Sequence, residues 1–148
     1  MKLSAGVLLY RRHNGRMEVL LAHPGGPFWK NKDAGAWSIP KGECGEGEDP
    51  MAAARREFEE ETGIRLDEEL TPLGEVKQRG GKTVRVWALE RDCDTATLHC
   101  NTFSLEWPPQ SGKMQEFPEV DRFQWFALEA AREKLLNAQA AFLDRLPA

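Results

Sequence analysis

The chain has 148 residues, of which 41% are hydrophobic and 30% are charged. This length predicts one compact domain, and the composition is too apolar for a disordered chain and too polar for a membrane protein. The formal net charge of −4 disfavours a protein that binds nucleic acid in bulk through the phosphate backbone. The three cysteines lack the spacing of a zinc site or a disulfide framework, so we expect a cytoplasmic protein.

The N-terminal apolar stretch predicts a strand and not a targeting segment. Leu3–Tyr10 is short and runs into Arg11 and Arg12 without a small-residue cleavage site. No run of 18 or more apolar residues occurs anywhere in the sequence. We therefore expect no transmembrane helix and no membrane partner.

Strand patterns fill the first part of the chain. Strand-like runs flank Asn14-Gly15, a pair that tolerates the positive φ of a tight hairpin. A loop rich in Pro, Gly and Lys follows at 24–36, and the next apolar run, which Pro40 stops, predicts a short third strand. The expected strands are Ala5–Arg11, Met17–His23 and Ala36–Ile39.

A helix over Asp49–Thr62 is the element with the clearest boundaries. Asp49 suits the N-cap, and Pro50 suits the first helical position, where its missing N–H costs nothing. Gly63 then predicts the end of the helix.

Four more strands and a helical C-terminus are expected beyond this helix. Gly80-Gly81 predicts a second hairpin, and Asn137 is a candidate break in the apolar, helically spaced C-terminal segment. The expected strands are Leu73–Arg79, Thr83–Glu90, Leu98–Trp107 and Arg122–Phe126, and the helical segment is Leu128–Leu146. The order β-β-β-α-β-β-β-β-α predicts an α/β fold in which helices cover both faces of a mixed sheet.

Three carboxylates crowd one face of the central helix. Glu57, Glu60 and Glu61 project together, and a single Arg56 cannot neutralise all three. Mg²⁺ and Mn²⁺ take oxygen ligands and commonly bind through a few carboxylates plus substrate phosphates. An acidic helix face is, however, usually only solvated surface, so the neighbouring residues decide between the two interpretations.

The neighbouring residues match the pattern G-x5-E-x7-R-E-U-x-E-E-x-G-U at every fixed position. The matching residues are Gly42, Glu48, Arg56, Glu57, Glu60, Glu61 and Gly63, with Phe58 and Ile64 at the apolar positions. Residues 42–64 thus resemble the Nudix box, and the length and element order resemble a single Nudix hydrolase domain over residues 1–148. The resemblance implies a Nudix-type α/β/α sandwich with a mixed β-sheet between helices.

The resemblance also implies a reaction and a metal site. Glu57, Glu60 and Glu61 are the implied ligands of Mg²⁺ or Mn²⁺, and Arg56 is implied to hold Glu57 by an ion pair. The implied reaction is attack by a metal-activated water on a phosphorus of a nucleotide, which breaks a phosphoanhydride bond.

Three further box residues are implied to act as scaffold. Gly42 is implied to allow the tight loop before the helix, and Glu48 is implied to brace that loop. Gly63 is implied to leave the helix in a left-handed conformation, which a Cβ disfavours.

A fourth carboxylate is predicted outside the box. Pro118–Phe126 resembles a late Nudix pattern in which a Glu precedes a Trp-Phe strand, and this favours Glu119 as a metal ligand or general base. Glu116 and Asp121 remain alternatives for that position. Glu57 remains an alternative for the base, because branches of the family differ in which carboxylate takes the proton.

Two residues are candidates for binding the substrate. Lys41 can reach a phosphate, and Trp29 in its Gly- and Lys-rich loop can stack on a base. The segment Trp37–Gly42 resembles the same region of dinucleoside polyphosphate hydrolases. Three histidines without a partner at ligand or triad spacing receive no chemical role: His13, His23 and His99.

These patterns predict a metal-dependent Nudix pyrophosphohydrolase. Its expected substrate is a small nucleotide of the nucleoside triphosphate or dinucleoside polyphosphate class, with a sugar or ADP-ribose derivative as a further possibility. A non-catalytic Nudix-fold module that senses nucleotides or binds proteins is the alternative from another class, although such modules usually lose box carboxylates. A monomer or homodimer is expected.

Overall fold

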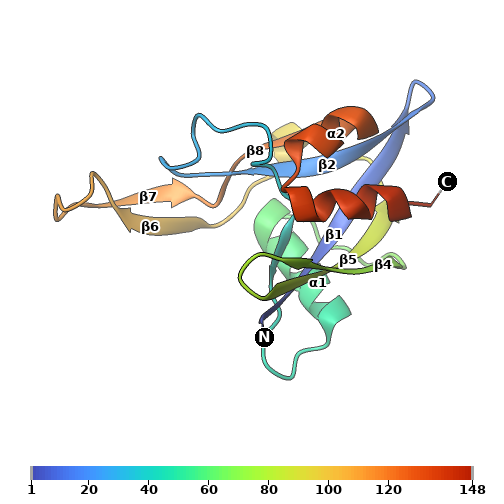
Figure 1. The fold of residues 1–148 in the computed structure, drawn as a ribbon, viewed down its shortest axis with the longest axis horizontal. Coiled ribbons are helices and arrows are strands. Elements are labelled where there is room, and N and C mark those ends of the chain that lie inside the picture. The colour runs from blue at the N-terminus through green and yellow to red at the C-terminus, as the bar shows by residue number, and fades with distance from the viewer. Residues whose placement is uncertain (1, 148) are drawn as a thin grey trace.

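The computed structural model describes residues 2–147, in which a mixed sheet lies between helical layers (Figure 1). The elements are β1 (Lys2–His13), β2 (Arg16–Pro24), β3 (Lys41–Glu43), α1 (Pro50–Thr62), β4 (Thr71–Gln78), β5 (Lys82–Glu90), η1 (Thr95–Thr97), β6 (Thr102–Glu106), β7 (Met114–Pro118), β8 (Val120–Ala127), α2 (Leu128–Lys134) and η2 (Asn137–Arg145). The main sheet has the order β4-β5-β1-β2-β8, and β3 pairs with β1. Because β1 and β5 are parallel and the other pairs are antiparallel, the expected mixed sheet is confirmed.

Both faces of the sheet are buried, as the alternation of side chains along β1 requires. Val7 and Leu9 belong to one buried cluster with Phe58 of α1. Leu8 belongs to a second cluster with Phe142 of η2. The expected sandwich of helix, sheet and helix is therefore confirmed, with α1 on one face and the C-terminal helices on the other (Figure 1).

Helix α1 begins and ends where its sequence signals predicted. The Asp49 side chain accepts a hydrogen bond of 3.0 Å from the Ala52 amide, and Pro50 is the first helical residue. Gly63 ends the helix with a φ of 83°, in the left-handed region. These local contacts fix the start of the helix and hence the direction in which its glutamates point.

One edge of β1 is shared by two strands. Ser4–Gly6 pairs with β3, whereas Tyr10–His13 pairs with β2. Between these stretches, the Val7 amide donates to the Pro40 carbonyl oxygen at 3.2 Å. β2 and β3 thus meet β1 at separate places, and residues of both line the cavity described below.

The third strand does not lie at Ala36–Ile39, where the apolar run predicted it. Trp37 and Ser38 make only isolated bridges, and the strand β3 follows Pro40. Proline has no N–H to donate, so a ladder cannot continue through it. The buried apolar residues of this run instead serve the core, while the paired strand is Lys41–Glu43.

The strand expected over Leu98–Trp107 is shorter than predicted, and an additional strand, β7, follows it. Only the second half of the expected range forms β6, which pairs with β7 as a separate two-stranded sheet. Figure 1 shows this pair projecting from the body of the molecule as an arm. β7 was missed because almost all of its residues are exposed, so no buried face imposes the alternation of a strand on its sequence.

The C-terminal helical segment is divided, as expected, but slightly earlier than Asn137. α2 ends at Lys134, and an isolated parallel bridge pairs Leu135 with Trp37 before the 3₁₀ helix η2. In this bridge the Trp37 amide donates to the Lys134 carbonyl oxygen and the Leu136 amide donates to the Trp37 carbonyl oxygen, which ties the helices to the segment at Trp37. Within residues 2–147, no helix is long and apolar enough to span a membrane.

Candidate active site

Arg56 joins the acidic side chains of α1 to the loop before the helix. Its Nε and Nη2 atoms each donate a hydrogen bond of 2.9 Å to the two carboxylate oxygens of Glu48. Its Nη1 atom donates to Glu57 at 2.8 Å and to Glu60 at 3.3 Å. Arg56 therefore contacts Glu57 as the resemblance implied, but its bidentate interaction is with Glu48.

Glu48 closes the loop that leads into the helix. Besides Arg56, its carboxylate accepts a hydrogen bond of 2.8 Å from the Gly45 amide. The hydrogen bonds from Arg56, followed by that from Gly45, lower the pKa of Glu48 to about 2. This side chain is thus an ionised brace between loop and helix.

Gly42 lies in close contact with a side chain of α1 and not in the loop before the helix. It lies in β3 and makes no left-handed turn. A Cβ on Gly42 would lie 1.8 Å from a carboxylate oxygen of Glu57, far inside any real contact. The missing side chain therefore makes room for the Glu57 carboxylate against the sheet, and the tight loop expected at this position is wrong.

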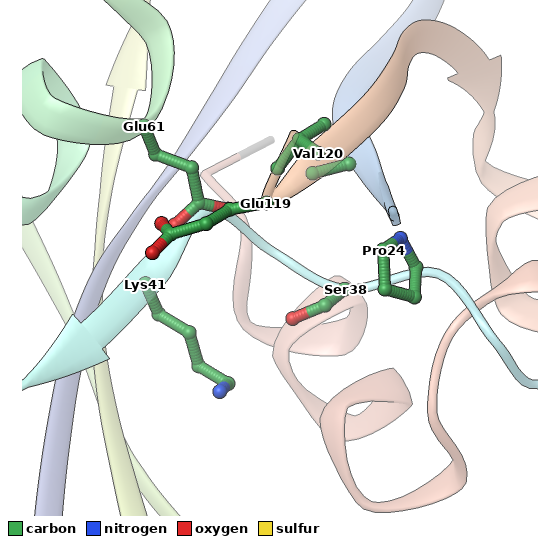
Figure 2. Close-up of a pocket in the computed structure, with 7 residues that line it drawn as sticks. Pro24, Ser38, Lys41, Glu61, Glu119 and Val120 are labelled. Carbon is green, nitrogen blue, oxygen red and sulfur yellow. The ribbon is translucent and has the colours of Figure 1, made fainter. Parts of the chain in front are cut away.

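A cavity of about 240 Å³ lies beside α1 (Figure 2). Its charged groups come from three segments: Lys41 from β3, Glu61 from α1 and Glu119 from the turn between β7 and β8. The remaining lining residues are Ala22, Pro24, Ser38 and Val120. Figure 2 shows the Glu119 carboxylate beside that of Glu61, whereas the Lys41 side chain starts near them and extends away, so that its nitrogen lies below both carboxylates in this view.

The pKa values of Glu61 and Lys41 in this cavity, and of the neighbouring Glu57, are shifted from their ordinary values. Burial raises the pKa of Glu61 to about 8, against the opposing charge of Lys41, and the charges of Glu119 and Glu57 add to the rise. Burial lowers the pKa of Lys41, although the nearby Glu61 charge favours its charged form. Burial also raises the pKa of Glu57, which Arg56 opposes. Such groups in a cavity are characteristic of functional sites.

Of the three acids near β8, Glu119 is the one that lines the cavity. Glu116 lies on β7 opposite Ser104, in the exposed arm. The carboxylate of Asp121 is bonded to His23 at 2.7 Å. The three acids that the sequence left as alternatives therefore lie in three different surroundings.

The three box glutamates do not converge on one point. Glu57 and Glu60 bond to Arg56, while Glu61 faces the cavity. Within residues 2–147, no group of three or more Asp, Glu, His or Cys side chains has the geometry to hold a metal ion. The donor chemistry nevertheless fits a hard divalent cation, because Glu61 is kept near Glu57 and Glu119 with Lys41 as the opposing charge.

Trp29 does not line the cavity. It lies in the exposed part of the loop after β2, where Lys32 Nζ is 5.2 Å from the centre of its ring. Of the two residues expected to bind the substrate, Lys41 lines this cavity and Trp29 does not.

Sequence reasoning missed two polar arrangements beside the cavity. Ser38, which lines it, bonds to the buried Gln139 of η2, and Gln139 also accepts from the Ile39 amide at 2.9 Å. His23, which was assigned no chemistry, is fully buried and pairs with Asp121. Both pairs join residues about a hundred positions apart, so no local pattern could reveal them.

Comparison with known proteins identifies a family. The family model for the NUDIX domain matches residues 1–146. An RNA pyrophosphohydrolase from Rhizobium meliloti is 32% identical over 104 residues, which are 60% of this chain and 57% of that protein. An octanoyltransferase from Myxococcus xanthus is 32% identical over 101 residues, which are 68% of this chain but only 25% of that protein. The chain therefore spans less than two thirds of either curated relative.

One solved structure matches over nearly its whole length. The binary complex of a C. elegans Ap4A hydrolase covers 98% of this chain and 94% of that chain, with 25% identity and a TM-score of 0.67. The layered architecture described above is therefore shared from end to end with a solved hydrolase.

Proposed function

The chain belongs to the NUDIX family, and we propose that it is a divalent-metal-dependent pyrophosphohydrolase that cleaves a phosphoanhydride bond in a nucleotide. The proposed substrates are nucleoside triphosphates or dinucleoside polyphosphates. One observation carries the proposal: Lys41, Glu61 and Glu119 come from separate segments and line one cavity. The names of the Ap4A hydrolase and the RNA pyrophosphohydrolase among the similar proteins support the same reaction class.

The size and charge of the cavity suit the phosphate part of a nucleotide. Its volume of about 240 Å³ is below the roughly 300–1,000 Å³ of pockets that enclose drug-sized ligands. Lys41 lies close enough to Lys82 for the Lys82 charge to lower the pKa of Lys41. An anionic phosphate would relieve this repulsion, so Lys41 is the proposed phosphate-binding residue.

The proposed reaction is hydrolysis at phosphorus. The oxygen of a water molecule bonds to a phosphorus, the phosphoanhydride P–O bond breaks, and the departing phosphate keeps the bridging oxygen. Glu119 is the proposed acceptor of the water proton, since it reaches the cavity from the side opposite α1 (Figure 2). Glu57 remains the second candidate for this role.

The box carboxylates are proposed to hold Mg²⁺ or Mn²⁺. A bound divalent ion would supply charge neutralisation on the pyrophosphate and a lower pKa for the attacking water. Glu57, Glu60 and Glu61 are the residues that would hold it. Arg56 keeps two of these carboxylates oriented through the bonds described above.

A turnover screen tests the proposal. The purified chain is incubated with nucleoside triphosphates, dinucleoside polyphosphates and ADP-ribose, with Mg²⁺, with Mn²⁺ and with excess EDTA, and the nucleotide products are separated by chromatography. We expect turnover of at least one of the first two classes in the presence of the metal, and its loss in EDTA. Glu61→Gln serves as the inactive reference.

Three outcomes would count against the proposal. Full activity in EDTA contradicts the metal dependence, and exclusive turnover of ADP-ribose contradicts the substrate class. Tight nucleotide binding without any turnover would favour the non-catalytic module.

A further inference from the structure

A buried histidine is held between two acceptors next to the Glu119 turn. The Nδ1 atom of His23 lies 2.7 Å from a carboxylate oxygen of Asp121, and its Nε2 atom lies 2.6 Å from the Lys32 carbonyl oxygen. The carboxylate oxygen of Asp121 and the carbonyl oxygen of Lys32 are both acceptors, so each ring nitrogen faces an acceptor and the ring is held at both ends. His23 is completely buried, whereas Asp121 is partly exposed.

A backbone hydrogen bond also joins the end of β2 to the turn at Glu119. The Gly25 amide donates a hydrogen bond of 2.9 Å to the Glu119 carbonyl oxygen. A Cβ on Gly25 would lie 1.9 Å from the Pro118 carbonyl oxygen, which shows how closely the two backbones approach. The end of β2 therefore contacts the turn both at Glu119 and, through His23, two residues later at Asp121.

The β7 side of the Glu119 turn holds the backbone less firmly than the β8 side. Glu119 directly follows β7, which belongs to the projecting arm, and a two-stranded hairpin alone is marginally stable. The Glu119 amide bonds to the Asn101 carbonyl oxygen at 3.0 Å, at the base of that arm. The anchor on the core side of the turn is therefore the β2 end.

We propose that His23 and Asp121 are positioning residues that hold the Glu119 carboxylate in the cavity. The pair ties the β8 side of the turn to β2 and to the loop at Lys32. These contacts fix the backbone that carries the Glu119 side chain. The proposal rests on the proposed role of Glu119 in the reaction. A displacement of about 1 Å in a catalytic group can cost on the order of 100-fold in rate.

The test is a double-mutant cycle on the best substrate from the turnover screen. His23→Ala removes both hydrogen bonds, and we expect kcat to fall about 10- to 100-fold while KM changes less than about twofold. In a Glu119→Gln background, His23→Ala should cost less than about twofold more, because its effect acts through Glu119. Losses that multiply in the double variant, or a loss confined to KM, would overturn the proposal.

Conservative variants separate positioning from a general folding defect. Asn at position 23 can donate to Asp121 from nearly the place of Nδ1, so His23→Asn should recover much of the kcat lost in His23→Ala. His13→Ala, in the exposed end of β1, is the matched control and should leave kcat unchanged. A His23→Asn variant as slow as His23→Ala would contradict the assignment.

Asp121→Ala provides a second route if His23→Ala does not fold. It removes the acceptor that faces His23 Nδ1 and keeps the His23 contact with the Lys32 carbonyl oxygen, so it should lower kcat in the parent but add little to the loss caused by Glu119→Gln. An Asp121→Ala variant with parental kcat would overturn the proposal. If Glu119→Gln alone leaves kcat unchanged, the proposed role of Glu119 fails; if it lowers kcat and the cycle is additive, only the positioning role fails.

Discussion

Arg56 donates hydrogen bonds of 2.9 Å from Nε and Nη2 to the two carboxylate oxygens of Glu48. One guanidinium thus connects the loop before α1 to the helix face that carries the glutamates. The same group bonds to Glu57 through Nη1 at 2.8 Å. The orientation of Glu57 therefore depends on how Arg56 is held by Glu48.

Replacing Arg56 by Lys keeps the charge but removes the planar fork. A lysine cannot bond to both oxygens of Glu48 and reach Glu57 together. We expect Arg56→Lys to lower kcat about 10- to 100-fold, the usual cost of losing a group that orients metal ligands, since Glu57 and Glu60 are proposed ligands. Steady-state kinetics with melting temperatures check this, and a change confined to KM would instead make Arg56 a substrate-binding residue.

A methyl group at Gly42 would displace the Glu57 carboxylate, since its Cβ would lie 1.8 Å from a carboxylate oxygen. We expect Gly42→Ala to lower kcat strongly and to keep the fold, which circular dichroism can verify. Gly45→Ala is the matched control, because its Cβ would lie 3.2 Å from the nearest atom, Glu48 Oε1, and this contact needs only a small shift of that side chain. Equal activity of the two variants would contradict the role assigned to Gly42.

Glu48 should make the stability of the protein depend on pH in the acid range. Its folded-state pKa of about 2 lies below the ordinary value of 4.5, so its stabilising contribution is complete above pH 4.5. This contribution is lost as the pH falls from about 4.5 to 2. Denaturant unfolding of the parent and of Glu48→Gln should converge in stability over this interval; a constant difference between them would contradict the ion pair.

The acids near β8 should differ sharply in their effects on catalysis. We expect Glu119→Gln to lower kcat about 10²- to 10⁴-fold, the usual contribution of a general base, with an unchanged melting temperature. Because Glu116 lies in the arm, Glu116→Gln should keep kcat within about threefold of the parent, far short of that contribution. If Glu116→Gln alone caused the loss, the assignment of Glu119 would be wrong; if neither did, Glu57 would be the next candidate.

Removing divalent ions should stop turnover without unfolding the protein. Glu57 and Glu60 are bonded to Arg56, and Glu61 lies beside Lys41, so these carboxylates have cationic partners of their own. We expect EDTA to abolish formation of the nucleotide products, to leave the circular dichroism spectrum unchanged, and to be reversed by adding Mg²⁺. Unfolding in EDTA would instead indicate a structural metal.

The parts of the fold that sequence alone predicted are those with local signals. Asp49, Pro50 and Gly63 set the limits of α1 through contacts within a few residues, and Asn14-Gly15 sets the first hairpin. The box pattern likewise predicted Glu48, Glu57 and Glu60, which bond to Arg56, because all of them lie within one short stretch of sequence. Gly42 is a partial exception, because its close contact with Glu57 joins two different elements.

The parts that sequence could not predict depend on distant segments. His23 and Asp121 lie 98 positions apart, and neither is distinguished by its neighbours in the sequence. β7 pairs only with β6 in the exposed arm, so burial imposes no periodicity on it. Such contacts depend on the tertiary structure and not on the local secondary-structure propensity of the sequence.

The most direct test of the proposed hydrolysis follows the oxygen of the attacking water. The best substrate is turned over with Mg²⁺ in water enriched in ¹⁸O, and the products are analysed by mass spectrometry. Attack at phosphorus predicts one labelled oxygen, bonded to phosphorus, in a single product per turnover, and no labelled product from Glu61→Gln. Label on a ribose carbon, or labelled phosphate at the parental rate from Glu61→Gln, would contradict phosphoanhydride cleavage in the cavity of Lys41, Glu61 and Glu119.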